Sequence, residues 1–256
     1  MEKEVVIEGI TYKYEYPFAY VKSCDKTVTT ANVKAKIEDC VVTTILPNAF
    51  DGCSNLTTVY IESAPEDDIA RFDSVVHLDF YIGSYAFSEC NNLTEITIPH
   101  YFNLFERGAF RKCTKLKTIN YFASVVLGDF CFSYCSSLSK IPFNYINLPE
   151  SCFSYCESLT EFSVREGVRE IETDAFEHCD NLEYVFIPKS VKIIGQTVFR
   201  NDFKLKKIEF EEPENWIYES AYFDEKKTIS FLDPEKNAKD FMWEDFDDGV
   251  ECYKKQ

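Results

Sequence analysis

One pattern recurs seven times along the chain, and it constrains the fold more than any other feature of the sequence. Each copy holds a Phe, a Cys three residues later, a Leu at six and apolar residues at nine and eleven, except that the seventh copy has Asp202 in place of the Cys. The phenylalanines of the seven copies are Phe50, Phe87, Phe110, Phe132, Phe153, Phe176 and Phe199. Successive positions differ by 37, 23, 22, 21, 23 and 23 residues. A repeat of this length predicts one elongated solenoid in place of separate globular domains.

The spacing of the apolar residues changes partway through each copy. In the first copy Phe50, Cys53 and Leu56 recur as expected for one face of a short helix or a tight helical turn. Val59 and Ile61 follow at a spacing of two, which indicates a short strand with both side chains pointing inward. Neither piece is long enough to bury its apolar side alone, so neighbouring copies must stack and share a core.

The repeats occupy residues 45–211, and the segments on either side have different patterns. Residues 1–44 alternate apolar and polar side chains, which predicts a β-rich cap made of hairpins over the first coil. Residues 212–256 are expected to form a mixed C-terminal cap. Within it, Asp233 and Pro234 predict the N-cap and the first position of a helix.

The interval between the first two phenylalanines is longer than the others because of an insertion at residues 62–81. Pro65, followed by three acidic residues, predicts the start of a helix. Alternating apolar residues from Val76 to Ile82 predict a strand that leads into the second coil. As the one irregularity of the array the insertion is a functional candidate, and a tolerated loop insertion is the simpler interpretation.

The charge balance limits the classes of partner. The formal net charge is −17, with 44 acidic residues against 27 Lys and Arg. This excludes non-specific binding to nucleic acid or to anionic membranes, because both need an excess of cations. No apolar run approaches the roughly 20 residues of a membrane span, so we expect no membrane insertion. The first residues lack the apolar centre of a secretory leader. We therefore expect a cytoplasmic protein, or a secreted or surface protein whose leader has been removed.

Eleven cysteines are present, and six occupy one column of the repeat, namely Cys53, Cys90, Cys113, Cys135, Cys156 and Cys179. The simplest interpretation is that each is a small buried residue whose thiol faces backbone carbonyls. A redox or metal ladder is the alternative, and the two CFSYC segments that end at Cys135 and Cys156 could place four thiols around zinc. Cys131 and Cys152, however, occupy a column that holds Ala in four other copies. We therefore expect no metal and no cofactor.

Catalytic motifs are absent from the sequence. The three histidines, His77, His100 and His178, have no ligand-like spacing, and there is no nucleophile elbow, phosphate loop or dinucleotide fingerprint. The acidic residues are scattered over solvent positions, so no pair stands out as an acid and a base. We therefore expect a protein that is not an enzyme.

The segments IGSYAFSECNNLTEITIP at 82–99 and IETDAFEHCDNLEYVFIP at 171–188 closely resemble the BspA-like leucine-rich repeat. The resemblance covers the seven copies. It implies a leucine-rich-repeat solenoid, a right-handed stack of about seven coils with a parallel β-sheet on one face and short helices or turns on the other. Many members of that family are secreted or surface proteins, and some are adhesins for host matrix proteins or other cells.

The residues between the inward strand positions point to the open face of the expected sheet. Those that we select as partner-binding are Thr58, Tyr60, Thr97, Asn120, Phe122, Lys140, Asn144, Glu161, Arg165, Tyr184, Phe186 and Lys207. Aromatic residues and Arg anchor protein interfaces more often than other surface residues. The plainer interpretation is that they only tile a sheet, since aromatic residues also favour strands.

These observations predict a non-enzymatic, adhesin-like binding protein that recognises a protein or glycan partner through the sheet face. The partner could be a host matrix or cell-surface protein, and we expect the chain to be a monomer. An intracellular interaction scaffold with reduced cysteines is the alternative function. A redox or metal module ranks third.

Overall fold

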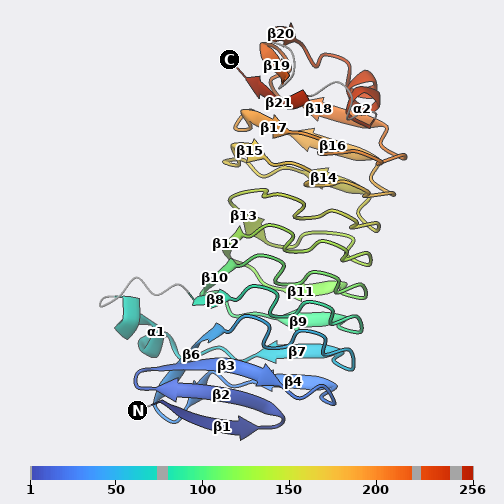
Figure 1. The fold of residues 1–256 in the computed structure, drawn as a ribbon. Helices are drawn as coiled ribbons and strands as arrows, with labels where there is room; N and C mark the ends of the chain where they lie inside the picture. Colours follow the sequence, from blue (N-terminus) through green and yellow to red (C-terminus); the bar gives the residue numbers. More distant parts are fainter. Residues whose placement is uncertain (1, 74–79, 221–225, 243–249, 256) are drawn as a thin grey trace.

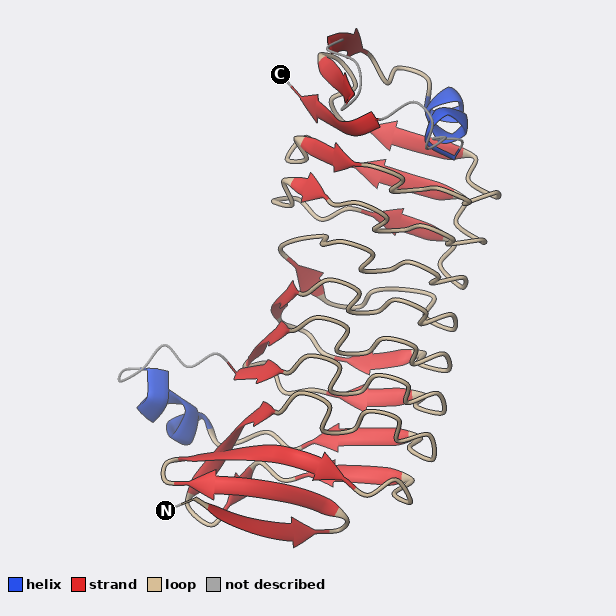
Figure 2. Ribbon diagram, viewed as in Figure 1, coloured by secondary structure: helices blue, strands red, loops and turns tan. Residues whose placement is uncertain are grey.

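The computed structural model describes residues 2–73, 80–220, 226–242 and 250–255. The chain forms a solenoid of about eight turns with parallel sheets, which confirms the expected architecture (Figure 1). Strands and turns dominate the coils, and the two helices lie outside the regular repeats (Figure 2). Within the described ranges, neither helix is long and apolar enough to span a membrane.

The first face of the solenoid carries the predicted strands and lies on the right in Figure 1. One parallel sheet has the order β11 (Thr118–Asn120), β9 (Glu95–Thr97), β7 (Thr58–Ile61), β4 (Thr30–Val33). A second parallel sheet has the order β14 (Glu161–Ser163), β16 (Tyr184–Ile187), β18 (Lys207–Phe210). Buried and accessible side chains alternate along these strands, so every second residue points to solvent.

The second face carries another set of parallel strands, which the sequence did not predict and which lie on the left in Figure 1. They are β6 (Cys40–Ile45), β8 (Phe80–Ile82), β10 (Phe102–Phe105), β12 (Ser124–Leu127) and β13 (Asn144–Tyr145), followed after a break by β15 (Glu170–Ile171) and β17 (Ile193–Gly195). These strands are two to six residues long. Such short runs carry too few alternations to stand out in one sequence.

Tight turns, and not helices, join the two faces around the phenylalanine column. In every copy the residues two before and two after the Phe have a positive φ, as with Phe130 at 57° and Tyr134 at 63° around Phe132. Left-handed residues cannot continue a right-handed helix, so the chain makes consecutive turns there. The helix-like spacing of Phe, Cys and Leu therefore reflects a compact series of turns.

Residues at the N-terminal end extend the second face and add a coil before the first copy of the repeat. β1 (Lys3–Ile7), β2 (Ile10–Glu15) and β3 (Phe18–Cys24) form an antiparallel meander. β3 pairs in parallel with β6, and β4 pairs in parallel with β7. A short antiparallel strand, β5 (Lys36–Ile37), also pairs with β6. Strands β3 and β4 thus stack on the first copy as a further turn of the solenoid.

The insertion and the C-terminal segment contain the two helices. α1 (Glu66–Asp73) follows Pro65 as predicted, and β8 covers the end of the predicted strand, whereas Val76 lies outside the described residues. At the C-terminus α2 (Pro234–Met242) is preceded by Asp233, whose Oδ1 accepts the backbone N–H of Glu235 and Lys236 at 3.1 Å. This is the predicted N-cap.

Three further strands complete the C-terminal end: β19 (Trp216–Ser220), β20 (Lys226–Ile229) and β21 (Val250–Lys255). β21 pairs antiparallel with β17 and so continues the second face. A helix, and not a strand, covers the end of the first face. α2 packs against β18, and the Asn237 amide donates a hydrogen bond to the Ile208 carbonyl at 3.0 Å. The last coil is therefore covered on both faces, by β21 on one and by α2 on the other.

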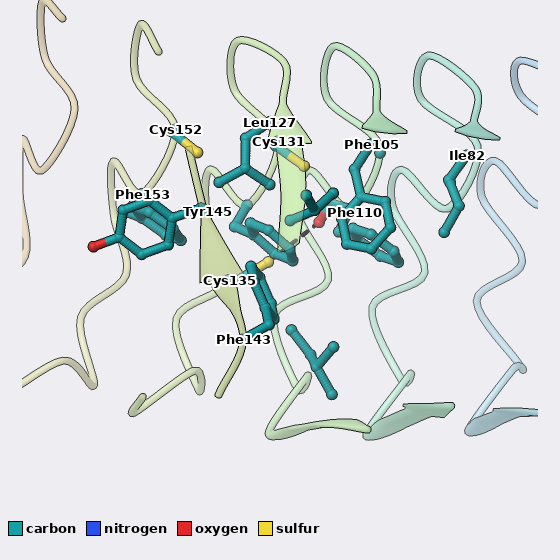
Figure 3. Close-up of a cluster of buried hydrophobic side chains, with 14 of the residues drawn as sticks. Ile82, Phe105, Phe110, Leu127, Cys131, Cys135, Phe143, Tyr145, Cys152 and Phe153 are labelled. Atoms are coloured by element: carbon teal, nitrogen blue, oxygen red, sulfur yellow. Dashed lines mark hydrogen bonds between the residues drawn. The ribbon is translucent and has the colours of Figure 1, made fainter. Parts of the chain in front are cut away.

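The core is a continuous stack of phenyl rings. The seven phenylalanines of the repeat are fully buried, and consecutive rings stack with centroids 4.7 to 5.7 Å apart. Figure 3 shows the middle of this stack, where Phe110 and Phe153 lie among buried cysteines and Phe143. Because each ring contacts the coil before and the coil after it, the stack couples neighbouring coils.

Candidate partner-binding face

The cysteine column has a structural explanation. The Sγ of Cys113 donates to the Phe87 carbonyl at 3.1 Å, and the Sγ of Cys135 donates to the Phe110 carbonyl at 3.2 Å, as the dashed line in Figure 3 shows. The same contact recurs for Cys90, Cys156 and Cys179 with the carbonyl one coil earlier. Ten cysteines are free and buried, and burial raises the pKa of the Cys113 thiol well above its usual value. The thiols thus bind backbone carbonyls, as the simplest interpretation of the column predicted.

The first cysteines of the two CFSYC segments are buried like those of the column. Cys131 and Cys152 are fully buried, and burial raises the pKa of both thiols well above the usual value. Within the described ranges no group of three or more His, Cys, Asp or Glu side chains is arranged to hold a metal ion. Nucleophilic chemistry needs the thiolate, which this environment disfavours.

Four of the selected residues lie on the N-terminal sheet of the first face. Thr58 and Tyr60 belong to β7, Thr97 to β9 and Asn120 to β11, and all four point outward. Tyr60 is 47% exposed. Tyr60, Thr97 and Asn120 are direct cross-strand neighbours in the parallel register, and the Asn120 amide donates to Thr97 Oγ1 at 3.2 Å. The structure therefore brings these residues together.

Phe122 follows β11 at the corner between the two faces. Its side chain is 83% exposed, the largest value among the exposed large apolar residues of the described chain. A ring this exposed contributes little to the core, and a single exposed apolar residue is common on protein surfaces.

The C-terminal sheet of the first face carries four more of the selected residues. Glu161 belongs to β14, Tyr184 and Phe186 to β16, and Lys207 to β18. The Lys207 ammonium lies 5.6 Å from the centre of the Tyr184 ring and 2.8 Å from Glu209 Oε2. The hydrogen bond from Lys207 lowers the pKa of Glu209. Burial is the largest cause of the raised pKa of Tyr184. This corner of the face is a preformed cluster of an aromatic ring and a charge pair.

The first face is interrupted between these sheets. Residues 139–143 form no strand, so Lys140 is exposed on an irregular segment. Pro142 occupies the position that Asn120 holds in the preceding coil, and Pro has no N–H to donate to a sheet ladder. Ile141, expected to point inward, is accordingly only half-buried. The expected continuous sheet is therefore two sheets.

Asn144 lies elsewhere than predicted. It begins β13 on the second face and pairs with Ser124 of β12. Asn144 is 12 residues after Phe132, whereas its partner Ser124 is 14 residues after Phe110, so the chain reaches the second face two residues sooner than in the preceding copy. The assignment of Asn144 to the first face was wrong. Arg165, in contrast, lies two residues after the end of β14 and is exposed.

A group of apolar residues on the second face was missed by sequence reasoning. Leu104, Val126 and Ile146 line a shallow groove of about 370 Å³ across β10, β12 and the end of β13. Val126 is 38% exposed and Ile146 is 57% exposed. The alternation in Ser124–Leu127 is the one sequence signal that could have identified an outward apolar position here.

Comparisons with known proteins agree with this geometry. The family model described as "BspA type Leucine rich repeat region" matches residues 77–147 and 127–246, more than half of the chain. No curated protein matches the sequence.

One solved structure supports the same fold, and a second is similar in sequence. The crystal structure of a leucine-rich repeat protein of T. pallidum superposes with a TM-score of 0.63 at 24% identity, over 79% of this chain and 91% of that one. A leucine-rich repeat protein from Bacteroides ovatus gives a TM-score of 0.48 at 22% identity, over 80% and 70% of the two chains.

Proposed function

The chain belongs to the BspA-type leucine-rich repeat family, and we propose that it is an adhesin-like binding protein that recognises a protein partner through its first face. Leucine-rich repeat proteins are typically protein-interaction modules. The mechanism is geometric. Stacked strands hold outward side chains at the strand spacing of about 4.8 Å, so little conformational freedom is lost when a partner binds.

The observation that carries the proposal is the exposure of aromatic side chains on a rigid frame. Tyr60 and Phe122 are 47% and 83% exposed, while their inward neighbours Val59 and Tyr121 are fully buried. Tyr121 is also fixed by a hydrogen bond from its hydroxyl to the Phe102 carbonyl at 2.6 Å. Rigid exposed aromatic rings are the side chains that most often dominate binding energy.

The remaining selected residues supply polar contacts around these rings. Lys140, Glu161 and Arg165 are exposed and lie near the interruption of the sheet, and none of the three forms an ion pair within the described part of the chain. Charges at the rim of an interface contribute mainly to orientation and association rate. We therefore assign the aromatic residues to affinity and these charges to specificity.

The interior thiols favour a second candidate, an intracellular interaction scaffold. Ten free, buried cysteines are compatible with a reducing compartment. The two candidates share the binding face and differ in the partner. Binding to purified extracellular matrix proteins supports the adhesin, whereas retention of a defined protein from the organism's own lysate supports the scaffold.

The test uses the full-length chain immobilised against a panel of purified matrix proteins and against the lysate. A variant with Tyr60→Ala and Phe122→Ala is expected to weaken binding of the identified partner at least tenfold, because each anchor contributes more than about 1 kcal/mol. The control is Ile146→Ala, which removes an apolar side chain of intermediate exposure, 57%, from the second face. Equal binding by the first variant and the parent protein would refute the assignment of the face.

A further inference from the structure

Asp202 replaces the column cysteine in the seventh coil and is the most unusual buried group of the described chain. The residue is fully buried. Its Oδ1 accepts the backbone N–H of Cys179 at 2.7 Å, whereas Oδ2 is the one buried side-chain oxygen or nitrogen without a hydrogen-bond partner in the described part of the chain. An unpaired carboxylate oxygen in such a site is costly.

The neighbouring coils show what this position requires. The thiol of Cys156 donates to the Phe132 carbonyl at 3.3 Å, and the thiol of Cys179 donates to the Phe153 carbonyl at 3.3 Å. The equivalent acceptor for the seventh coil is the Phe176 carbonyl, which already accepts the Cys179 N–H at 3.1 Å. A carboxylate has no hydrogen to donate there, but a neutral carboxylic acid has one.

We propose that Asp202 is protonated in the folded protein at neutral pH and that Oδ2 donates this proton to the Phe176 carbonyl. The hydrogen bond joins the seventh coil to the sixth, so the contact between these two coils depends on pH. Oδ1 remains the acceptor for the Cys179 N–H. The neutral acid thus supplies one acceptor and one donor where the other coils use a thiol. Loss of the proton leaves the negatively charged Oδ2 facing the Phe176 carbonyl oxygen with no hydrogen between them, and their repulsion weakens the contact between the sixth and seventh coils.

The charges around Asp202 oppose its ionisation. Burial is the largest cause that raises the pKa of Asp202 well above its usual value, and the negative charges of Asp180 and Glu177 in the sixth coil act in the same direction. Arg200 is already bound to Glu177, and His178 lies 3.7 Å from Asp180. On the other side, Phe199 contacts Phe241 of α2, and the buried residues of α2 carry no charge.

The pH dependence follows from the direction of this shift. A carboxyl group whose pKa is raised on folding keeps its proton in the native state after the unfolded chain has lost it. The stabilising contribution of this one proton is therefore complete below the ordinary Asp pKa of 3.8 and is lost as the pH rises toward the folded-state pKa. Over that window the unfolding equilibrium constant rises about tenfold per pH unit because of this one proton.

The decisive variant is Asp202→Asn, because the amide supplies the same acceptor and donor at every pH. We expect the midpoint of urea unfolding of the wild type to fall relative to that of the variant as the pH rises from 5 to 8. Asp202→Cys restores the residue of the other coils and is expected to behave like the variant. The control is Asp180→Asn, which removes an exposed charge and is expected to leave most of the pH slope in place.

A direct measurement requires no substitution. In protein labelled with ¹³C at the Asp carboxyl carbons, the Asp202 signal is expected to titrate well above the ordinary range of Asp, because burial raises its pKa. The amide of Cys179, compared with that of Cys156, is expected to lose protection from hydrogen exchange when Asp202 ionises. A midpoint near pH 4, or parallel stability curves for wild type and Asp202→Asn between pH 5 and 8, would overturn the proposal.

Discussion

Phe132 lies in the middle of the phenyl stack, and its truncation tests how the solenoid is held together. The ring is fully buried and stacks on Phe110 at 5.2 Å and on Phe153 at 5.7 Å between centroids, with interplanar angles of 5° and 6°. It also contacts Phe143 at 5.8 Å. Phe132→Ala therefore opens a cavity that touches three coils.

The expected cost is large. Truncation of a buried Phe to Ala costs about 3–5 kcal/mol. The two stacked partners place Phe132 at the upper end, because each aromatic pair adds about 0.5–1.5 kcal/mol beyond burial. We therefore expect the free energy of unfolding to fall by about 5 kcal/mol, a sizeable share of the 5–15 kcal/mol typical of a domain.

The matched control is Tyr134→Ala in the same coil. Tyr134 is half-buried on the turn surface and stacks on Tyr155 at 4.3 Å. Truncation of Tyr134 leaves no cavity in the core, so Tyr134→Ala is expected to lower the free energy of unfolding by about 1 kcal/mol.

Urea unfolding followed by circular dichroism measures both costs. In a solenoid each coil contacts only its neighbours, so Phe132→Ala is also expected to broaden the transition as the two halves separate. Hydrogen exchange would then show different opening free energies for coils before and after Phe132. A loss below about 2 kcal/mol, or equal losses for the two variants, would refute the view that the stack couples the coils.

Three further predictions concern single positions. The thiol of Cys113 is expected to resist a disulfide reagent at pH 8 until urea unfolds the chain, since burial raises its pKa; fast labelling of the native protein would contradict this. Ser151 has a φ of 52°, which glycine adopts without strain, so Ser151→Gly is expected to raise the free energy of unfolding by up to about 1 kcal/mol. The control is Ser154→Gly, at a residue without positive φ, which is expected to lower the free energy of unfolding by about 0.5–1 kcal/mol. Burial raises the pKa of Tyr121 to about 12. The stabilising contribution of its protonated hydroxyl is therefore complete below the ordinary pKa of 10 and is lost between pH 10 and 12. Difference absorbance titration of wild type and Tyr121→Phe measures this, and a Tyr121 midpoint at pH 10 would be inconsistent with the buried hydroxyl.

Much of the candidate face could be predicted because strand alternation is a local property. Tyr60, Thr97, Tyr184 and Lys207 point outward as their positions in the repeat indicated. Their role in binding stays a prediction. The prediction that Asn144 lies on the first face was wrong because its position depends on the length of its coil relative to the preceding coil. That is a property of two coils together.

The sequence by itself determined the core of this protein. Phe, Cys and Leu recur at positions that every coil must turn inward, because a coil buries its apolar side only against identical neighbours. The burial of the three columns confirms this from the first copy to the last.

Only the tertiary structure decided how the surface is divided. The turns around each Phe, the second set of parallel strands and the break at Pro142 depend on backbone pairing between coils. Such pairing is set by the register of one coil against the next, and no single copy of the repeat encodes it. The same holds for Asp202, whose environment is built by the sixth coil, so its unpaired oxygen became visible only when the coils were stacked.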